Sequence, residues 1–128
     1  MEANRTLNAT WHWPKWVTWA LVLSPLGLLF DVLLLGAHVR LALGHWPKPM
    51  IENYSSPAFE LHSSCVIVFG CFAAYVAIPL WLLLLAFRKF RVSARYHVIQ
   101  IGVFLAGWCC IIGYLAWDPY RFVAWFMD

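Results

Sequence analysis

The side chains of this sequence with the clearest chemical potential are one aspartate and three histidines set among apolar residues. Asp31 interrupts an apolar stretch from residue 17 to 43, nine residues before Arg40, or about 13 Å along a helix. A carboxylate at that depth in a membrane costs at least about 2.5 kcal/mol, so it marks a function or a specific partner. Counting the same depth along the later apolar stretches predicts Tyr75 and Trp108 as hydrogen-bond donors to Asp31.

Three roles are open for Asp31. It pairs with those donors, or is protonated, and only fixes helix register; it serves a proton relay or a cation site; or it contacts a partner subunit. The first role requires only neighbouring donors, and we take it as the leading expectation.

His38, His45 and His62 are expected at one end of the molecule, with Glu52 and Glu60 nearby. His38 follows Asp31 by two helical turns, which places both on one face. Imidazole and carboxylate together suit zinc or copper, and two histidines from different helices suit a haem iron or a chlorophyll magnesium. The spacing matches no closed metal-ligand motif, so a metal or tetrapyrrole site is an alternative, and no cofactor is the leading expectation.

The composition fixes the kind of element that positions these side chains. The chain has 128 residues, 63% of them hydrophobic and 12% charged, against about a quarter charged in soluble proteins. We expect an all-α, integral membrane fold with three transmembrane helices at about 17–41, 62–87 and 97–117, in a single membrane domain, 1–128. Pro25 and Pro79 predict kinks in the first two helices, and short interfacial segments are expected at the N-terminus, in the first loop and at the C-terminus.

The distribution of Lys and Arg predicts the orientation. The N-terminal tail and the second loop carry six of these residues, and the first loop and C-terminal tail carry three. The positive-inside rule then places the N-terminus in the cytoplasm and the C-terminus outside, in a membrane that we expect to be a bacterial inner membrane. N-x-S/T triplets at Asn4, Asn8 and Asn53 would favour an outward N-terminus if glycosylated, but Asn8 and Asn53 flank the first span, so the charge count decides our expectation.

Small residues recur at helical spacing along the second and third spans. Such stripes let helix backbones approach closely, and we expect them to pack helices together, either within this chain or against another protein: Gly70, Ala74, Ala77, Gly102, Ala106 and Gly113. Gln100 is expected to hydrogen-bond across to another span. The basic second loop is expected to lie against lipid head groups through Arg88, Lys89, Arg91 and Arg95.

The sequence contains no pattern of a catalytic site. No nucleophile has a neighbouring base, no carboxylates are paired on one helix face, and no phosphate-binding loop is present, so we expect no enzyme and no nucleic-acid binding. The leading functional hypothesis is an accessory subunit of a membrane complex, with lipids and larger integral membrane subunits as partners, in a system that transduces energy. The alternatives are a His-ligated haem, pigment or metal protein, and a proton- or ion-coupled oligomeric transporter that uses Asp31.

Three short motifs carry a loose resemblance. They are the run from Arg40 to Pro47 that ends the first span, Pro79-Leu80-Trp81 within the second, and Trp117-Asp118-Pro119 followed by Trp125-Phe126. With these motifs the chain resembles small uncharacterised proteins of bacterial inner membranes. The resemblance covers most of the chain and implies no function or site residue.

Overall fold

A computed structural model describes residues 15–86 and 94–127, and every regular element in these ranges is helical. The first helix is α1 (Lys15–Leu43). The second long helix consists of α2 (Pro57–Cys71), a π-helical segment η1 (Phe72–Ala77) and α3 (Ile78–Ala86). It is followed by α4 (Ala94–Trp117) and by a short C-terminal helix, α5 (Phe122–Phe126). The predicted all-α fold is confirmed.

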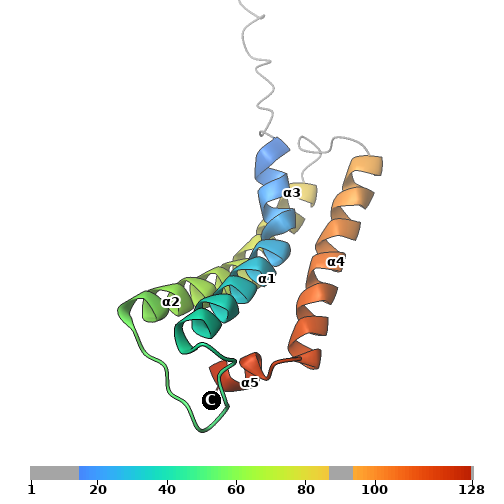
Figure 1. Cartoon of the computed structure of the whole chain (residues 1–128). Helices are drawn as coiled ribbons and strands as arrows, with labels where there is room; N and C mark the ends of the chain where they lie inside the picture. The colour runs from blue at the N-terminus through green and yellow to red at the C-terminus, as the bar shows by residue number, and fades with distance from the viewer. Residues whose placement is uncertain (1–14, 87–93, 128) are drawn as a thin grey trace, which may run out of the picture.

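The helix α1 continues through Pro25 without a break. Proline has no backbone N–H, so the carbonyl of Leu21, four residues earlier, loses its helical donor. The Ser24 hydroxyl donates to that carbonyl at 2.7 Å. A neighbouring serine therefore satisfies the group that Pro25 leaves unpaired, and α1 bends visibly in this region (Figure 1).

The second long helix starts with a well-formed N-terminus and changes its winding before its proline. Ser56 caps α2 by accepting a hydrogen bond from the Phe59 N–H at 3.1 Å, and Pro57 occupies the first turn, where a missing N–H is harmless. Residues 57–61, which precede the predicted start of the second span at 62, are therefore the first turns of this helix. Pro79 cannot donate to the carbonyl of Tyr75, and the wider π turns of η1 directly precede it.

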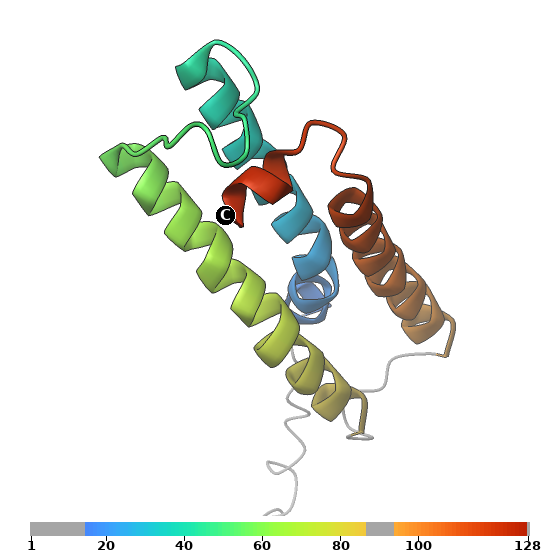
Figure 2. The same ribbon diagram turned by 90° about the horizontal axis from the view of Figure 1, so that it is seen from below.

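The three long helices form a row with α1 in the middle. Figures 1 and 2 show α2–α3 on one side of α1 and α4 on the other. Gly107 is the point where α4 approaches α1 most closely, since a Cβ built on it would lie 3.0 Å from Pro25 Cβ and 3.5 Å from the Leu26 backbone nitrogen. At the end of α4 that follows the 87–93 segment, the Tyr96 and Thr18 hydroxyls are 3.2 Å apart and join the same two helices.

The C-terminal helix α5 folds back under the row, next to the 44–56 loop (Figure 2). Asp118 starts this turn with a positive φ, and its carboxylate accepts hydrogen bonds from the Val123 and Ala124 N–H groups at 3.0 and 2.9 Å. Phe122 is 1% exposed and lies against Gly36 of α1. The segment expected at the interface is thus a packed cap on the end of α1.

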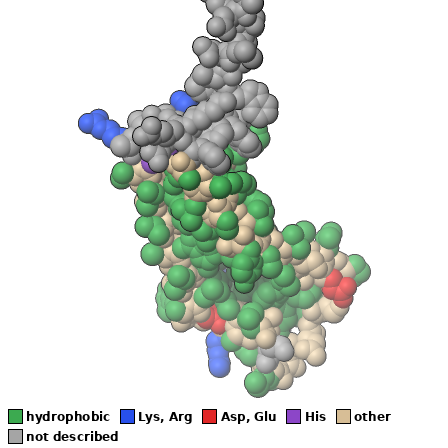
Figure 3. All heavy atoms as spheres, turned by 180° about the vertical axis from the view of Figure 1, so that it is seen from behind, with side chains coloured by type: hydrophobic (Ala, Val, Ile, Leu, Met, Phe, Trp, Pro, Cys, Tyr) green, Lys and Arg blue, Asp and Glu red, His purple; other side chains and the backbone are tan. Residues whose placement is uncertain are grey.

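Three helices are long and apolar enough to cross a membrane: Lys15–Leu43, Pro57–Ala86 and Arg95–Trp117. Figure 3 shows hydrophobic side chains covering the middle of one face, with charged side chains confined to its two ends. Only 33%, 22% and 22% of the most apolar part of these helices is buried within the chain. The fold is that of a small multi-pass membrane protein with much of its apolar surface facing outward.

Candidate functional site

Asp31, His62 and His38 form a hydrogen-bonded chain between α1 and α2. Nε2 of His62 lies 3.3 Å from Oδ1 of Asp31, and Nδ1 of His62 lies 3.4 Å from Nδ1 of His38. The side chains of His62 and Asp31 are 23% and 25% exposed. His62 therefore uses both ring nitrogens, one on a carboxylate and one on a second imidazole.

The packing of α1 against α2 brings these three side chains together. Gly27 faces the Phe69 ring, and a Cβ built on Gly27 would lie 3.0 Å from that ring. This close approach lies one turn from Asp31 on the α1 side and two turns from His62 on the α2 side. Asp31 and His38 are two turns apart on α1, so both reach His62 across the same seam.

The structure gives Asp31 a different partner from the two that the sequence predicted. Tyr75 is 78% exposed on the outside of η1. The indole N–H of Trp108 is buried and has no hydrogen-bond partner among the residues that the structure describes. The prediction counted depth from helix ends taken as level, but His62 lies in the second turn of α2 whereas Asp31 lies about three turns from the end of α1.

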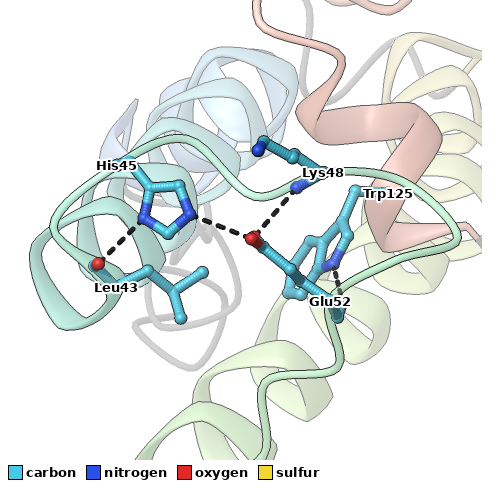
Figure 4. Close-up of polar contacts among 5 residues, drawn as sticks. All are labelled: Leu43, His45, Lys48, Glu52 and Trp125. Carbon is cyan, nitrogen blue, oxygen red and sulfur yellow. Dashed lines mark hydrogen bonds and ion pairs between the residues drawn. The ribbon is translucent and has the colours of Figure 1, made fainter.

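His45 does not join His38 and His62 and forms a separate contact in the 44–56 loop (Figure 4). Its Nε2 lies 3.0 Å from Oε1 of Glu52, and its Nδ1 lies 2.9 Å from the Leu43 carbonyl. Glu52 also accepts from the Lys48 N–H at 3.2 Å, and the Glu52 carbonyl accepts from the Trp125 indole at 2.6 Å. We call His45, Glu52 and Trp125 the loop latch, because it joins the loop to α5.

The loop latch shifts the pKa values of its two ionisable members, His45 and Glu52. The hydrogen bond to Glu52, and next the one to the Leu43 carbonyl, raise the pKa of His45 above its usual value of 6.5. The hydrogen bond from His45, and next the one from the Lys48 N–H, lower the pKa of Glu52 below its usual 4.5. At mildly acidic pH both groups are charged, which is the form that makes every bond of the latch.

The predicted packing residues divide into two groups. In the second long helix, Ala77 is fully buried, Ala74 is partly buried, and Gly70 faces Leu28 of α1 at ordinary contact distance. On α4, a Cβ at Gly102 or Gly113 would meet nothing within 4 Å, and Ala106 is exposed. The first group packs helices within this chain, and the second faces away from it.

Several buried polar groups of α4 and α3 have no hydrogen-bond partner within residues 15–86 and 94–127. Gln100 is fully buried, and neither its amide nitrogen nor its amide oxygen is hydrogen-bonded, which differs from the predicted bond to another span. The Trp81 indole N–H is likewise buried and unpaired, next to Phe104 at a ring separation of 5.1 Å. Gln100 could be singled out from the sequence as a polar residue in an apolar span, but its place near Trp81 could not, since the two residues lie on different helices.

Most of the basic second loop lies outside the residues that the structure describes. Arg88, Lys89 and Arg91 fall in the 87–93 segment, and Arg95 lies exposed in the first turn of α4. Within the ranges that the structure describes, no three His, Cys, Asp or Glu side chains are grouped to hold a metal ion. The four cysteines, all in described helices, are free.

The chain matches no protein family, and no curated protein or solved structure is significantly similar to it. The loose resemblance to small bacterial inner-membrane proteins thus identifies no family.

Proposed function

We propose that this protein is a non-enzymatic subunit of a larger membrane complex and that it packs against its partners through the outer face of α4. The observation that carries this proposal is the outward position of Gly102, Ala106 and Gly113. These residues are spaced by four and seven residues, which is one and two helical turns, so they form one stripe along the helix. We call it the α4 stripe.

The α4 stripe is separate from the contact that α4 makes inside this chain. Gly107 packs against Pro25 and Leu26 of α1, and buried Phe104 and Ile111 lie on the same inner side. The stripe lies on the opposite side of the helix, where Cys109 and Cys110 are also exposed. In lipid, helix association depends on close van der Waals packing, and small residues allow that approach.

The small fraction of buried apolar surface also favours a partner. A row of three helices leaves both outer helices with a free side, and most of α4 faces away from α1. A larger membrane protein seated on the α4 stripe would give this helix a second packed face. The complex, on this proposal, belongs to a bacterial inner membrane and has the N-terminus of this chain in the cytoplasm, as the six-to-three distribution of Lys and Arg favours.

The test compares two variants that make the same chemical change. Ala106→Leu fills the middle of the α4 stripe, and Ala116→Leu adds the same bulk at an exposed position beyond it. Each protein is purified from its own membranes in a mild detergent, and co-eluting subunits are quantified by mass spectrometry. We expect stoichiometric partners with the unaltered chain and with Ala116→Leu, and loss of those partners with Ala106→Leu, because overpacking costs about 1–3 kcal/mol.

Two results would contradict the proposal. One is an unaltered chain that elutes without stoichiometric partners, alone or as a homo-oligomer. The other is equal partner recovery with Ala106→Leu and Ala116→Leu, which would place the interface away from the α4 stripe.

A further inference from the structure

In the hydrogen-bonded chain of Asp31, His62 and His38, one ring nitrogen makes no hydrogen bond to the described residues. His62 is bonded at both nitrogens, and His38 is bonded at Nδ1. Within the described residues, Nε2 of His38 is not hydrogen-bonded to protein. The chain therefore has a closed end at the Asp31 carboxylate and an open end at His38.

Counting protons shows what the open end can do. Each of the two hydrogen bonds holds one proton, so two neutral imidazoles and an ionised Asp31 satisfy both bonds and carry a net charge of −1. One more proton, on Nε2 of His38, brings the net charge to zero and leaves both bonds in place. Protons can also shift along the two bonds, so the added charge is shared by all three side chains.

The surroundings of the chain favour the neutral state. The seam lies between apolar helices, where an uncompensated charge is expensive and a neutral group of opposite charges is much less so. On α1, Arg40 is directed away and lies over the Trp46 ring at 5.1 Å. In the loop and on α2, Glu52 is bound by His45 and Glu60 by Ser55 at 2.7 Å, so neither carboxylate turns to the seam.

The loop also places Tyr54 against His38, with the two rings edge-on and 6.5 Å apart between centroids. Its hydroxyl is 3.2 Å from Ser56 Oγ and accepts a hydrogen bond from it. The residues that α5 packs against the core here, Phe122 and Trp125, are aromatic and carry no charge. No cation from these neighbouring elements therefore neutralises Asp31 in place of a proton.

An open cavity leads toward the same region. It has a volume of about 620 Å³ and lies between the loop, α2 and α5. Tyr54 lines the cavity and also contacts His38, and Ser63, the residue after His62, lines it as well. The cavity is thus lined by one residue that contacts His38 and by the residue that follows His62, although neither histidine lines it.

We propose that Asp31, His62 and His38 form a binding site for a single proton, which enters at Nε2 of His38. The proton leaves a surface water and binds the free ring nitrogen, and no other bond is broken. The site does not depend on the proposed role as a subunit, since all three residues belong to this chain.

The test is a titration of the full-length protein in lipid nanodiscs, followed by ¹⁵N NMR of its labelled histidine rings. At alkaline pH we expect His62 to be protonated at Nε2 and His38 at Nδ1. On acidification, the two histidines should change together at one midpoint, with uptake of one proton by the pair. Two separate midpoints, or the same tautomer in both rings, would overturn the proposal.

Two variants sharpen the result. Asp31→Asn removes the negative charge, so the pair should bind its proton about tenfold more weakly or worse. His45→Gln removes a histidine that is not hydrogen-bonded to Asp31, His62 or His38. It should leave the joint titration midpoint of His38 and His62 unchanged. A joint midpoint that is unaffected by Asp31→Asn would overturn the site, and the wild-type titration decides the question if that variant does not fold.

A metal ion is the competing ligand for this arrangement. Adding stoichiometric Zn²⁺ to the wild-type protein should leave the histidine titration in place. Asp31 and His38 contact opposite ring nitrogens of His62, and within the described residues no three His, Cys, Asp or Glu side chains are grouped to hold a metal ion. If equimolar Zn²⁺ abolishes the titration, the site binds a metal and the proton proposal is wrong.

Discussion

At the scale of single residues, the contacts of His45 indicate that its ring is protonated when the loop latch is formed. A neutral imidazole carries one N–H, yet both ring nitrogens of His45 face acceptors, the Glu52 carboxylate and the Leu43 carbonyl. Only the protonated ring donates to both. The loop latch is therefore complete only while His45 is charged.

We predict that the pKa of His45, measured by NMR in detergent micelles, lies above 6.5, and that Glu52→Gln returns it toward that value. The raised pKa makes the His45 contribution to stability full below pH 6.5 and lost as pH rises through the folded-state pKa. The lowered pKa of Glu52 makes its contribution present above pH 4.5 and lost as pH falls through its folded-state pKa. The latch is thus strongest between pH 4.5 and 6.5.

A histidine pKa at or below 6.5 in the unaltered protein would contradict this prediction. Lys48→Gln is a suitable control, because Glu52 contacts the Lys48 backbone N–H, which that change retains. The Lys48 ammonium itself lowers the pKa of His45 slightly, so the control should leave the pKa raised.

The sequence identified Asp31 and the histidines as candidates but not their pairing. A carboxylate within an apolar stretch stands out because a charge inside a membrane has a high free-energy cost, and this cost can be recognised without knowing which residue lies beside it. Which histidine reaches it depends on the offset between α1 and α2, and a short His side chain tolerates little error in that offset. Sequence spacing does not contain this offset, because the 44–56 loop separates the two helices.

At the scale of helices, the three spans follow directly from the apolar runs. Each run is long enough to cross a hydrocarbon layer, and backbone pairing inside lipid leaves helix as the only form for it. All three helices begin two to five residues before the predicted starts, at Lys15, Pro57 and Ala94 instead of 17, 62 and 97. The π-helical segment η1 could not be predicted, because its residues have no signature that separates them from an α-helix.

Two glycines on α4 give a matched prediction about helix packing. Gly107→Ala should lower the free energy of unfolding by about 1–3 kcal/mol, because the new methyl group would lie 3.0 Å from the rigid Pro25 ring. Gly102→Ala should be neutral or stabilise by up to about 1 kcal/mol, because a Cβ there meets nothing within 4 Å and alanine favours helix. Denaturation in detergent, followed by circular dichroism, measures both.

The reverse order of stabilities would mean that the α1–α4 contact lies on another face of α4. Equal losses from both substitutions would indicate that the α4 stripe is also packed in the isolated protein. Either result would contradict the assignment of Gly107 to a face of α4 packed on α1 and of Gly102 to an outward face.

The cap of α5 gives a second prediction at this scale. Asp118→Ala removes the acceptor of two backbone N–H groups, Val123 and Ala124, and should destabilise α5 by about 0.5–2 kcal/mol. Hydrogen exchange of those two amides should speed up while amides in the middle of α1 stay protected. Asp118→Asn keeps one acceptor oxygen and should fall between the two, whereas unchanged exchange in Asp118→Ala would show that the cap contributes nothing.

At the scale of the whole molecule, α1 holds the fold together. Both other long helices pack on it, and α5 covers its end (Figure 1). The order of the helices in this row could not be inferred from the sequence. A polar face would mark the exposed side of each helix, but all three spans are apolar on every side, so no pattern shows which helix is packed on two sides. The arrangement explains why small residues on α4 occur on two opposite faces, one toward α1 and one outward.

The row also predicts which parts of the chain lie on the same side of the membrane. The 44–56 loop and the first turn of α4 are at opposite ends of the molecule (Figure 1), and one crossing helix, Pro57–Ala86, separates them in sequence. A membrane-impermeant maleimide added to sealed vesicles should therefore label Ser55→Cys and Arg95→Cys from opposite sides. Both positions are exposed, so neither is shielded by the fold.

The unaltered chain, with its four cysteines inside the helices, serves as the control for background labelling. Inverted vesicles should exchange the two labelling patterns, which excludes a difference in intrinsic reactivity. Labelling of both positions from one side would mean that Pro57–Ala86 does not cross. In that case Asp31, His62 and His38 would lie at a membrane surface. Water would then solvate the charge of Asp31, and the neutral, proton-bound state would no longer be favoured.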